Sequence, residues 1–376
     1  MRMFRIILTA LIFCSNSYAQ FGASINIQSG HASNIFSNYR QLPDFYNDLQ
    51  ADLNYDIISA TKGLRLFYSG NATLFETYDY RSYQVHSVGL SYYTYIGEKQ
   101  SKINVGFNGR IRRHTDEYLW YQYNQGYGYI TLKIPFQDQL FGYVGVNFRF
   151  RNYEKLSPYS YWRSTSYLRL SRFYNSGTSI IVEFDYMQKQ YLHSDASSPL
   201  QDFPYMQTDG SGNSRQIVGL LRIAQAVTSK TGLSTQFLIR RNLNSSIRYL
   251  INEAGYYYSD EELFDDMFGY QAEQWNMSVK HRLPWKMQLS MGGTYLLKHY
   301  FNRLALDLQG YPFEDQRLRD DQRLIGWVSL TKVWQYSKTM KPITFSVDFS
   351  AMKNNSNDPY YTFNTHYLTV GISQNF

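Results

Sequence analysis

The sequence of 376 residues predicts an all-β protein, a transmembrane antiparallel up-and-down β-barrel of about 16 strands. Three observations predict it. Apolar and polar residues alternate along about sixteen segments, tight turns alternate with long loops, and the chain opens on a secretory-type leader. Mean hydropathy is only −0.46, and aromatic residues make up 18% of the chain. A barrel needs apolar residues only at every second position, so a low mean hydropathy is compatible with it.

The last ten residues, 367–376, show the alternation most clearly. One parity holds Leu368, Val370, Ile372 and Phe376, and the other holds Thr369, Gly371, Ser373 and Asn375. Such a segment is a strand with one apolar face and one polar face. Two segments are ambiguous, Arg215 to Ala226 and Leu324 to Val333, because both of their parities are partly apolar. Without these two segments the predicted count falls from 16 strands to 14.

The connections between the predicted strands fall into two classes that alternate strictly along the chain. Segments such as 97–101 and 135–139 are tight, whereas 192–213, 242–271 and 301–322 are long. With its terminal Phe376, this plan resembles that of bacterial outer-membrane β-barrel proteins of the porin-like kind. The resemblance covers the general plan of the mature chain. It implies short periplasmic turns, long extracellular loops, an outer-membrane location in a Gram-negative bacterium, and Phe376 as the insertion signal for the barrel-assembly machinery.

The N-terminus has the features of a signal peptide. Arg2 and Arg5 precede an apolar run, and the small-residue site Ser17-Tyr18-Ala19 follows it. We therefore predict a signal peptide over residues 1–19 and a single barrel domain over residues 20–376. Cleavage would remove Cys14, the only cysteine, and so leave no disulfide or thiolate metal site. Subtracting the two arginines from the formal net charge of +7 leaves +5.

If the apolar parity faces lipid, the other parity lines the lumen, and many of its residues are charged. The predicted pore-lining bases are Arg110, Arg112, Arg149, Arg151, Arg163, Arg169, Arg222 and Arg240. The predicted pore-lining acids are Asp52, Asp56, Glu183, Asp185 and Asp348. One wall is therefore expected to be rich in arginine, with carboxylates near the barrel closure. Opposed charged walls orient polar solutes, and arginine ladders favour anions. The alternative is that these residues pair with one another or simply solvate a wide lumen.

These features predict a porin-like channel that passes polar or anionic small solutes, because barrels of about 16 strands normally enclose an aqueous channel. The alternatives are a component for export, secretion or assembly, such as a polysaccharide conduit, or an adhesin. An outer-membrane hydrolase ranks lower, because the sequence holds no catalytic motif and no compelling histidine cluster. The expected partners are outer-membrane lipid, lipopolysaccharide and small polar solutes. The sequence leaves open whether the protein forms a homo-oligomer.

No cofactor, metal or nucleic acid is expected as a ligand. The cations are scattered rather than gathered in a basic run, which argues against nucleic acid. The long segment 242–271 carries Asp260, Glu261, Glu262, Asp265 and Asp266. Five carboxylates in seven positions could bind a divalent cation, but they lack the ligand spacing and the glycine of an EF-hand loop. We expect a solvated acidic loop.

Overall fold

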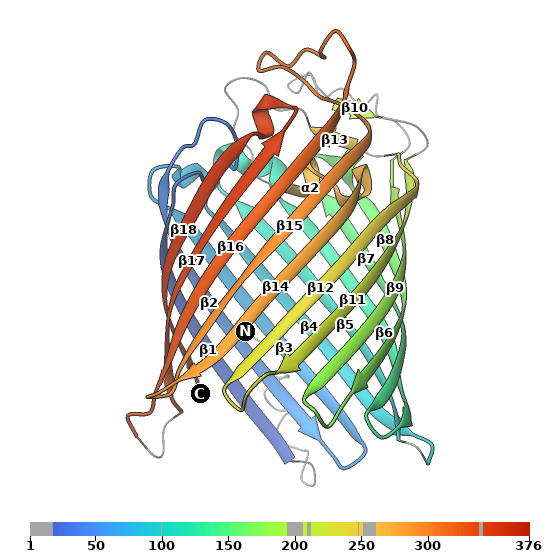
Figure 1. The fold of residues 1–376 in the computed structure, drawn as a ribbon, viewed down its shortest axis with the longest axis vertical. Helices are drawn as coiled ribbons and strands as arrows, with labels where there is room; N and C mark the ends of the chain where they lie inside the picture. Colours follow the sequence, from blue (N-terminus) through green and yellow to red (C-terminus); the bar gives the residue numbers. More distant parts are fainter. Residues whose placement is uncertain are drawn as a thin grey trace, which may run out of the picture.

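The computed structural model describes residues 18–98, 100–193, 206–208, 212–246, 248–250, 261–337 and 341–376. It forms a closed barrel of sixteen antiparallel strands, each paired with its neighbours along the chain (Figure 1). The strands are β1 (Tyr18–Ala32), β2 (Asp44–Ile58), β3 (Lys62–Phe75), β4 (Tyr83–Ile96), β5 (Ser101–His114), β6 (Tyr123–Gln137), β7 (Leu140–Tyr153), β8 (Tyr161–Phe173), β9 (Thr178–Tyr191), β11 (Asn213–Ala226), β12 (Thr231–Asn244), β14 (Tyr270–Leu283), β15 (Met287–Leu304), β16 (Leu318–Trp334), β17 (Ile343–Ser356) and β18 (Phe363–Asn375).

The strand count is 16, as the sequence predicts, and both ambiguous segments are strands of the barrel, β11 and β16. One predicted loop is shorter than expected. The loop over 301–322 shrinks to 305–317, because β15 and β16 continue towards each other past a register shift between His299 and Leu304.

The barrel closes where β1 meets β18. Residues 24–32 of β1 pair with residues 367–375 of β18. Tyr18 and Ala19 lie beyond this seam and pair only with β2. Removal of the predicted signal peptide would therefore shorten β1 without touching the residues that close the barrel. Residues 1–17 lie outside the described part of the chain, and the signal peptide stays a prediction.

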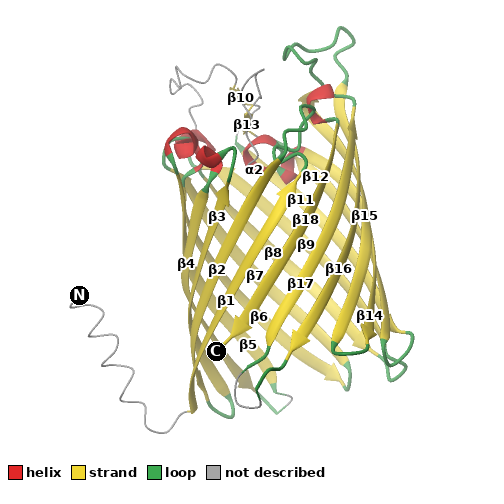
Figure 2. Ribbon diagram, turned by 90° about the vertical axis from the view of Figure 1, so that its left-hand side faces the viewer, coloured by secondary structure: helices red, strands yellow, loops and turns green. Residues whose placement is uncertain are grey.

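The tight turns gather at one end of the barrel, which we call the turn end. The long connections gather at the other, the long-loop end, together with the short helices (Figure 2). These helices are η1 (Asp79–Arg81), η2 (Asp116–Tyr121), η3 (Ser157–Tyr159), α2 (Glu261–Phe264), η4 (Met267–Gly269) and η5 (Pro359–Tyr361). A small sheet of β10 (Met206–Thr208) and β13 (Arg248–Leu250) lies among the loops. No helix in the described ranges is both long enough and apolar enough to cross a membrane.

The outer surface of the barrel is apolar. Large hydrophobic side chains of the predicted lipid parity are exposed around the whole circumference, among them Phe21 at 68%, Val88 at 62% and Met277 at 66%. Near the turn end the exposed aromatics Trp285, Trp334 and Tyr336 join them. Aromatics at this level are typical of the girdle at a membrane interface.

Towards the long-loop end the outer surface becomes polar. Outward-facing ion pairs occur there, such as Arg113 with Glu154 and Arg241 with Glu273. A strand of 14 residues is about 46 Å long at ~3.3 Å per residue. Because a tilted membrane strand needs only about 9–11 residues, the strands rise above the bilayer as a polar collar.

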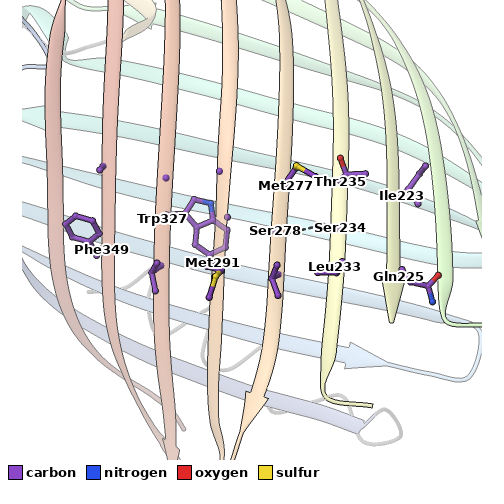
Figure 3. A pocket seen from close by; sticks show the side chains of 16 residues that line it. Ile223, Gln225, Leu233, Ser234, Thr235, Met277, Ser278, Met291, Trp327 and Phe349 are labelled. Carbon is purple, nitrogen blue, oxygen red and sulfur yellow. Dashed lines mark hydrogen bonds between the residues drawn. The ribbon is translucent and has the colours of Figure 1, made fainter. Parts of the chain in front are cut away.

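One hollow of about 680 Å³ lies on the outer wall (Figure 3). A row of neighbouring residues across β14 to β17 forms its floor: Met277 pairs with Gly293, Gly293 with Gly326, and Gly326 with Ala351. The small size of Gly293, Gly326 and Ala351 opens the hollow between larger side chains such as Met277 and Phe349. Since these residues share the outward parity, the hollow faces the membrane and is separate from the lumen.

Candidate functional site

The lumen between β4 and β8 carries a wall on which cations alternate with aromatic rings. Arg112 lies over the ring of Tyr83, with 4.4 Å between the guanidinium carbon and the ring centroid. Lower down, Arg149 lies 5.9 Å from the centroid of Tyr127. Such stacking holds a guanidinium against the wall and leaves its charge in place. We call this surface the basic–aromatic wall.

Glycines on neighbouring strands let several tyrosine rings lie flat along this wall. A Cβ on Gly106 would come within 2.4 Å of the ring of Tyr129, and a Cβ on Gly145 within 2.4 Å of the ring of Tyr167. Each ring therefore occupies the space above a residue without a side chain. The lumen stays wider than it would with these rings projecting inward.

All eight predicted basic residues lie on the inward parity of their strands, but their surroundings differ. Arg110 donates to Ser87 Oγ at 3.0 Å, and Arg222 is exposed to the lumen from β11. Arg163 lies 3.6 Å from Met267 Sδ, and Arg240 lies over the ring of Tyr270. Two are paired with acids: Arg151 with Glu262, and Arg169 with Glu183.

The five predicted acids also lie on the inward parity. Asp56 forms a bidentate pair with Arg65, at 2.6 and 2.8 Å. Asp52 accepts hydrogen bonds from Gln50 and Ser24. Asp185 and Asp348 have no cationic partner among the described residues. Ion pairs between adjacent strands thus neutralise some of the charges that were predicted to form opposed basic and acidic walls. The other predicted charges are not paired in this way.

The long-loop end is narrowed by the segment Glu261–Gly269, which folds into the barrel between β7 and β15. We call this segment the acidic cap. Glu262 pairs with Arg151 and lies 3.6 Å from Lys189, while Asp266 pairs with Lys189. Asp265 pairs with Lys298 on β15 at 2.5 Å, four strands further round the barrel from Lys189 on β9. Phe268, fully buried, packs against Met187 and Val218 on the inner wall.

The expectation of a solvated acidic loop is therefore wrong for Glu262, Asp265 and Asp266. The side chains of Asp265 and Asp266 are only 7% and 1% exposed. They turn inward because the strand ends opposite them present lysine and arginine, and a carboxylate leaves water only where a cation and hydrogen bonds receive it. Tyr161 and Tyr300 donate hydrogen bonds to Glu262 and Asp265 respectively. Asp260 lies outside the described residues.

Sequence reasoning missed five lysines of the lumen, because it selected only arginines as pore-lining cations. Lys189 and Lys298 hold the acidic cap. Lys102 and Lys133 lie at the turn end of the basic–aromatic wall. Lys280 faces the lumen from β14. All five lie on the polar parity of their strands, so strand parity applied to lysine would have found them.

Acid should release the cap. Burial alone would raise the pKa of Glu262, but the charges of Arg151 and Lys189 hold it at about 2. Burial likewise opposes ionisation of Asp265, yet Lys298 and Arg319 hold its pKa well below the usual range. Because both folded-state pKa values are lowered, the stabilisation is complete above the ordinary values of 4.5 and 3.8 and is lost as pH falls below them.

We therefore expect single-channel conductance to rise as the pH on the long-loop side falls from about 5 towards 3. A Glu262→Gln, Asp265→Asn variant serves as the control, since its cap no longer titrates at these positions. An equal rise in that variant would contradict this assignment.

The closed barrel, its apolar outer belt, its aromatic girdle and its charged lumen together define a membrane-spanning β-barrel of the outer-membrane, porin-like class. No protein-family model and no curated protein matches the sequence. Solved structures from Pseudomonas aeruginosa do share the fold. The outer-membrane protein OpdK is 9% identical with a TM-score of 0.52, covering 95% of this chain and 99% of that one. OccK5 (OpdH) is 11% identical with a TM-score of 0.51, covering 95% and 98%. OprD is 11% identical with a TM-score of 0.50, covering 95% of each.

Proposed function

We propose that the protein is a porin-like channel of the Gram-negative outer membrane that passes small polar solutes and prefers anions. The basic–aromatic wall carries the proposal. Arg110, Arg149 and Arg163 have no carboxylate partner among the described residues, and all three face the lumen from β5, β7 and β8. Unpaired cations in a confined aqueous passage raise the local concentration of anions.

The opposite wall supports the same reading. Asp348 on β17 lies eight strands from Arg149 on β7 in the ring of sixteen, and so across the lumen from the basic–aromatic wall, while Asp52 on β2 lies on the other side of the closure. Charges of opposite sign on facing walls produce a field across the passage, which orients a solute that is both charged and polar. A fully self-paired lumen would have no such field.

Transport is favoured over catalysis for two reasons. The solved structures that share the fold are outer-membrane porins, one of them OpdK with vanillate. The lumen surface also has its cations spread along a path rather than gathered around one nucleophile. Export of an acidic polymer, display of the loops as an adhesin, and a homo-oligomer stay predictions of the sequence.

Charge selectivity tests the proposal. In planar bilayers under a KCl gradient, we expect discrete conductance steps. We also expect a reversal potential that is shifted from zero towards the equilibrium potential of chloride. Changing Arg149 and Arg163 to Glu should reduce the chloride-to-potassium permeability ratio by a factor of about five or more, since two unit charges ~4 Å apart in water interact by ~1 kcal/mol.

Arg241→Glu is the matched control, because Arg241 carries the same charge on the outer face of the barrel. Insertion into the bilayer without conductance would contradict the channel proposal. Selectivity for cations would contradict only the proposed preference for anions.

A further inference from the structure

Two lysines face each other at the turn end of the lumen. Lys102 on β5 and Lys133 on β6 are direct cross-strand partners, and both lie on the inward parity. Like charges in directly opposed positions destabilise a sheet. Neither lysine has a carboxylate partner in the part of the chain that the structure describes. The pair is therefore a concentrated positive charge that nothing in the described fold neutralises.

Aromatic rings on the flanking strands hold the two ammonium groups apart. Lys102 Nζ lies 3.9 Å from the ring centroid of Tyr93 on β4. Lys133 Nζ lies 4.0 Å from the ring centroid of Phe141 on β7. These contacts are cation–π interactions, and they leave the N–H donors of both groups available.

A hollow of about 480 Å³ lies at this pair of lysines. Besides the two lysines and Phe141, its lining includes Asn104, Thr131, Tyr95 and Tyr143. The volume lies within the ~300–1,000 Å³ range of small-molecule sites. The hollow offers two cations, an amide and a hydroxyl near one another, with aromatic surface around them.

We infer that this hollow is a binding site for a small aromatic carboxylate at the periplasmic exit of the lumen. The two ammonium groups suit the carboxylate, because charge-assisted hydrogen bonds are the strong ones. The rings of Tyr95, Phe141 and Tyr143 suit a planar apolar body, which a phosphate or acetate ion lacks. The inference rests on the proposed function for its route of entry and names a solute class for it.

The test uses the full-length purified protein with benzoate as the probe. Titration calorimetry in detergent measures binding independently of conduction. We expect benzoate to bind more tightly than acetate or phosphate. Hydrogen bonds to charged groups are worth about a tenfold change each, so Lys102→Gln and Lys133→Gln should each weaken benzoate about tenfold. Lys280→Gln is the matched control, because Lys280 faces the lumen near the same end from β14, on the other side of the barrel.

Several outcomes would overturn the inference. These are no benzoate binding, equal loss of binding in Lys280→Gln, or equal affinity for acetate and phosphate. A heat-modifiable gel shift confirms that each variant is a folded barrel before it is titrated. If benzoate binds as expected but the protein shows no conductance, the site stands and the channel proposal fails. If the protein conducts anions but does not bind benzoate, the site fails and the channel stands.

Discussion

Replacing Asp265 and Asp266 by Asn should open the long-loop end of the channel and increase its conductance severalfold at neutral pH. The double variant removes the carboxylate that pairs with Lys298 and the nearer of the two carboxylates that pair with Lys189, which keeps only Glu262 at 3.6 Å. Each lysine side chain is only 3% exposed. Removing one member of a buried ion pair costs about 3–5 kcal/mol, because the remaining charge stays out of water. Release of the cap restores hydration to both lysines, so the open arrangement becomes the favoured one.

Two further variants separate this effect from a general loss of stability. Asp320→Asn removes an acid from an exposed pair with His299 on the outer face, and it should leave conductance unchanged. Adding Lys189→Met to Asp266→Asn removes both partners of one ion pair, which destabilises the docked cap less than removing one partner. This variant should therefore restore part of the population of channels in which the cap is docked. A double Asn variant that folds normally and conducts like the wild type would show that the cap does not limit the passage.

Deleting Phe376 should reduce the amount of folded barrel in the outer membrane by about an order of magnitude, while lowering the stability of refolded protein by only about 1–3 kcal/mol, the value of two or three hydrogen bonds. The Phe376 amide donates to Ala23 O at 2.7 Å, and the Ala23 amide donates to Phe376 O at 3.4 Å. Lys341 Nζ also donates to Phe376 O at 2.6 Å. These contacts close the seam, but the ring is 53% exposed on the outside and adds little to internal packing.

Quantitative fractionation with a heat-modifiable gel shift measures the assembled barrel, and urea titration measures stability. Phe376→Tyr should assemble normally, because it keeps an aromatic ring and every backbone contact. Phe376→Ala keeps the backbone contacts and loses the ring, so it isolates the ring's part in assembly. Normal assembly of the deletion would argue against Phe376 as the insertion signal.

The strands and their order could be predicted because the sequence pattern that defines each strand lies within the strand and its adjoining turns. Each strand alternates with period two, and each turn or loop marks a reversal, so that parity and loop length define a meander without any distant contact. The ambiguous segments β11 and β16 show the limit of this reasoning. Both of their faces are partly apolar, as with Ile325 and Trp327 on the lumen side of β16, and only pairing with their neighbours assigns them to the barrel.

The sequence by itself determined the barrel, its alternation of tight turns with long loops, and the apolar and polar parities of most of its strands. Only the tertiary structure decided which charged side chains of the polar parity are paired within the protein and which remain available to a solute. Glu262, Asp265 and Asp266 are more than 60 residues from Lys189 along the chain and more than 30 from Lys298, and no periodicity links them. Whether an acidic loop stays in water or enters the mouth depends on a small difference between desolvation and pairing. That difference is set by the positions of strand ends that come together only when the barrel closes.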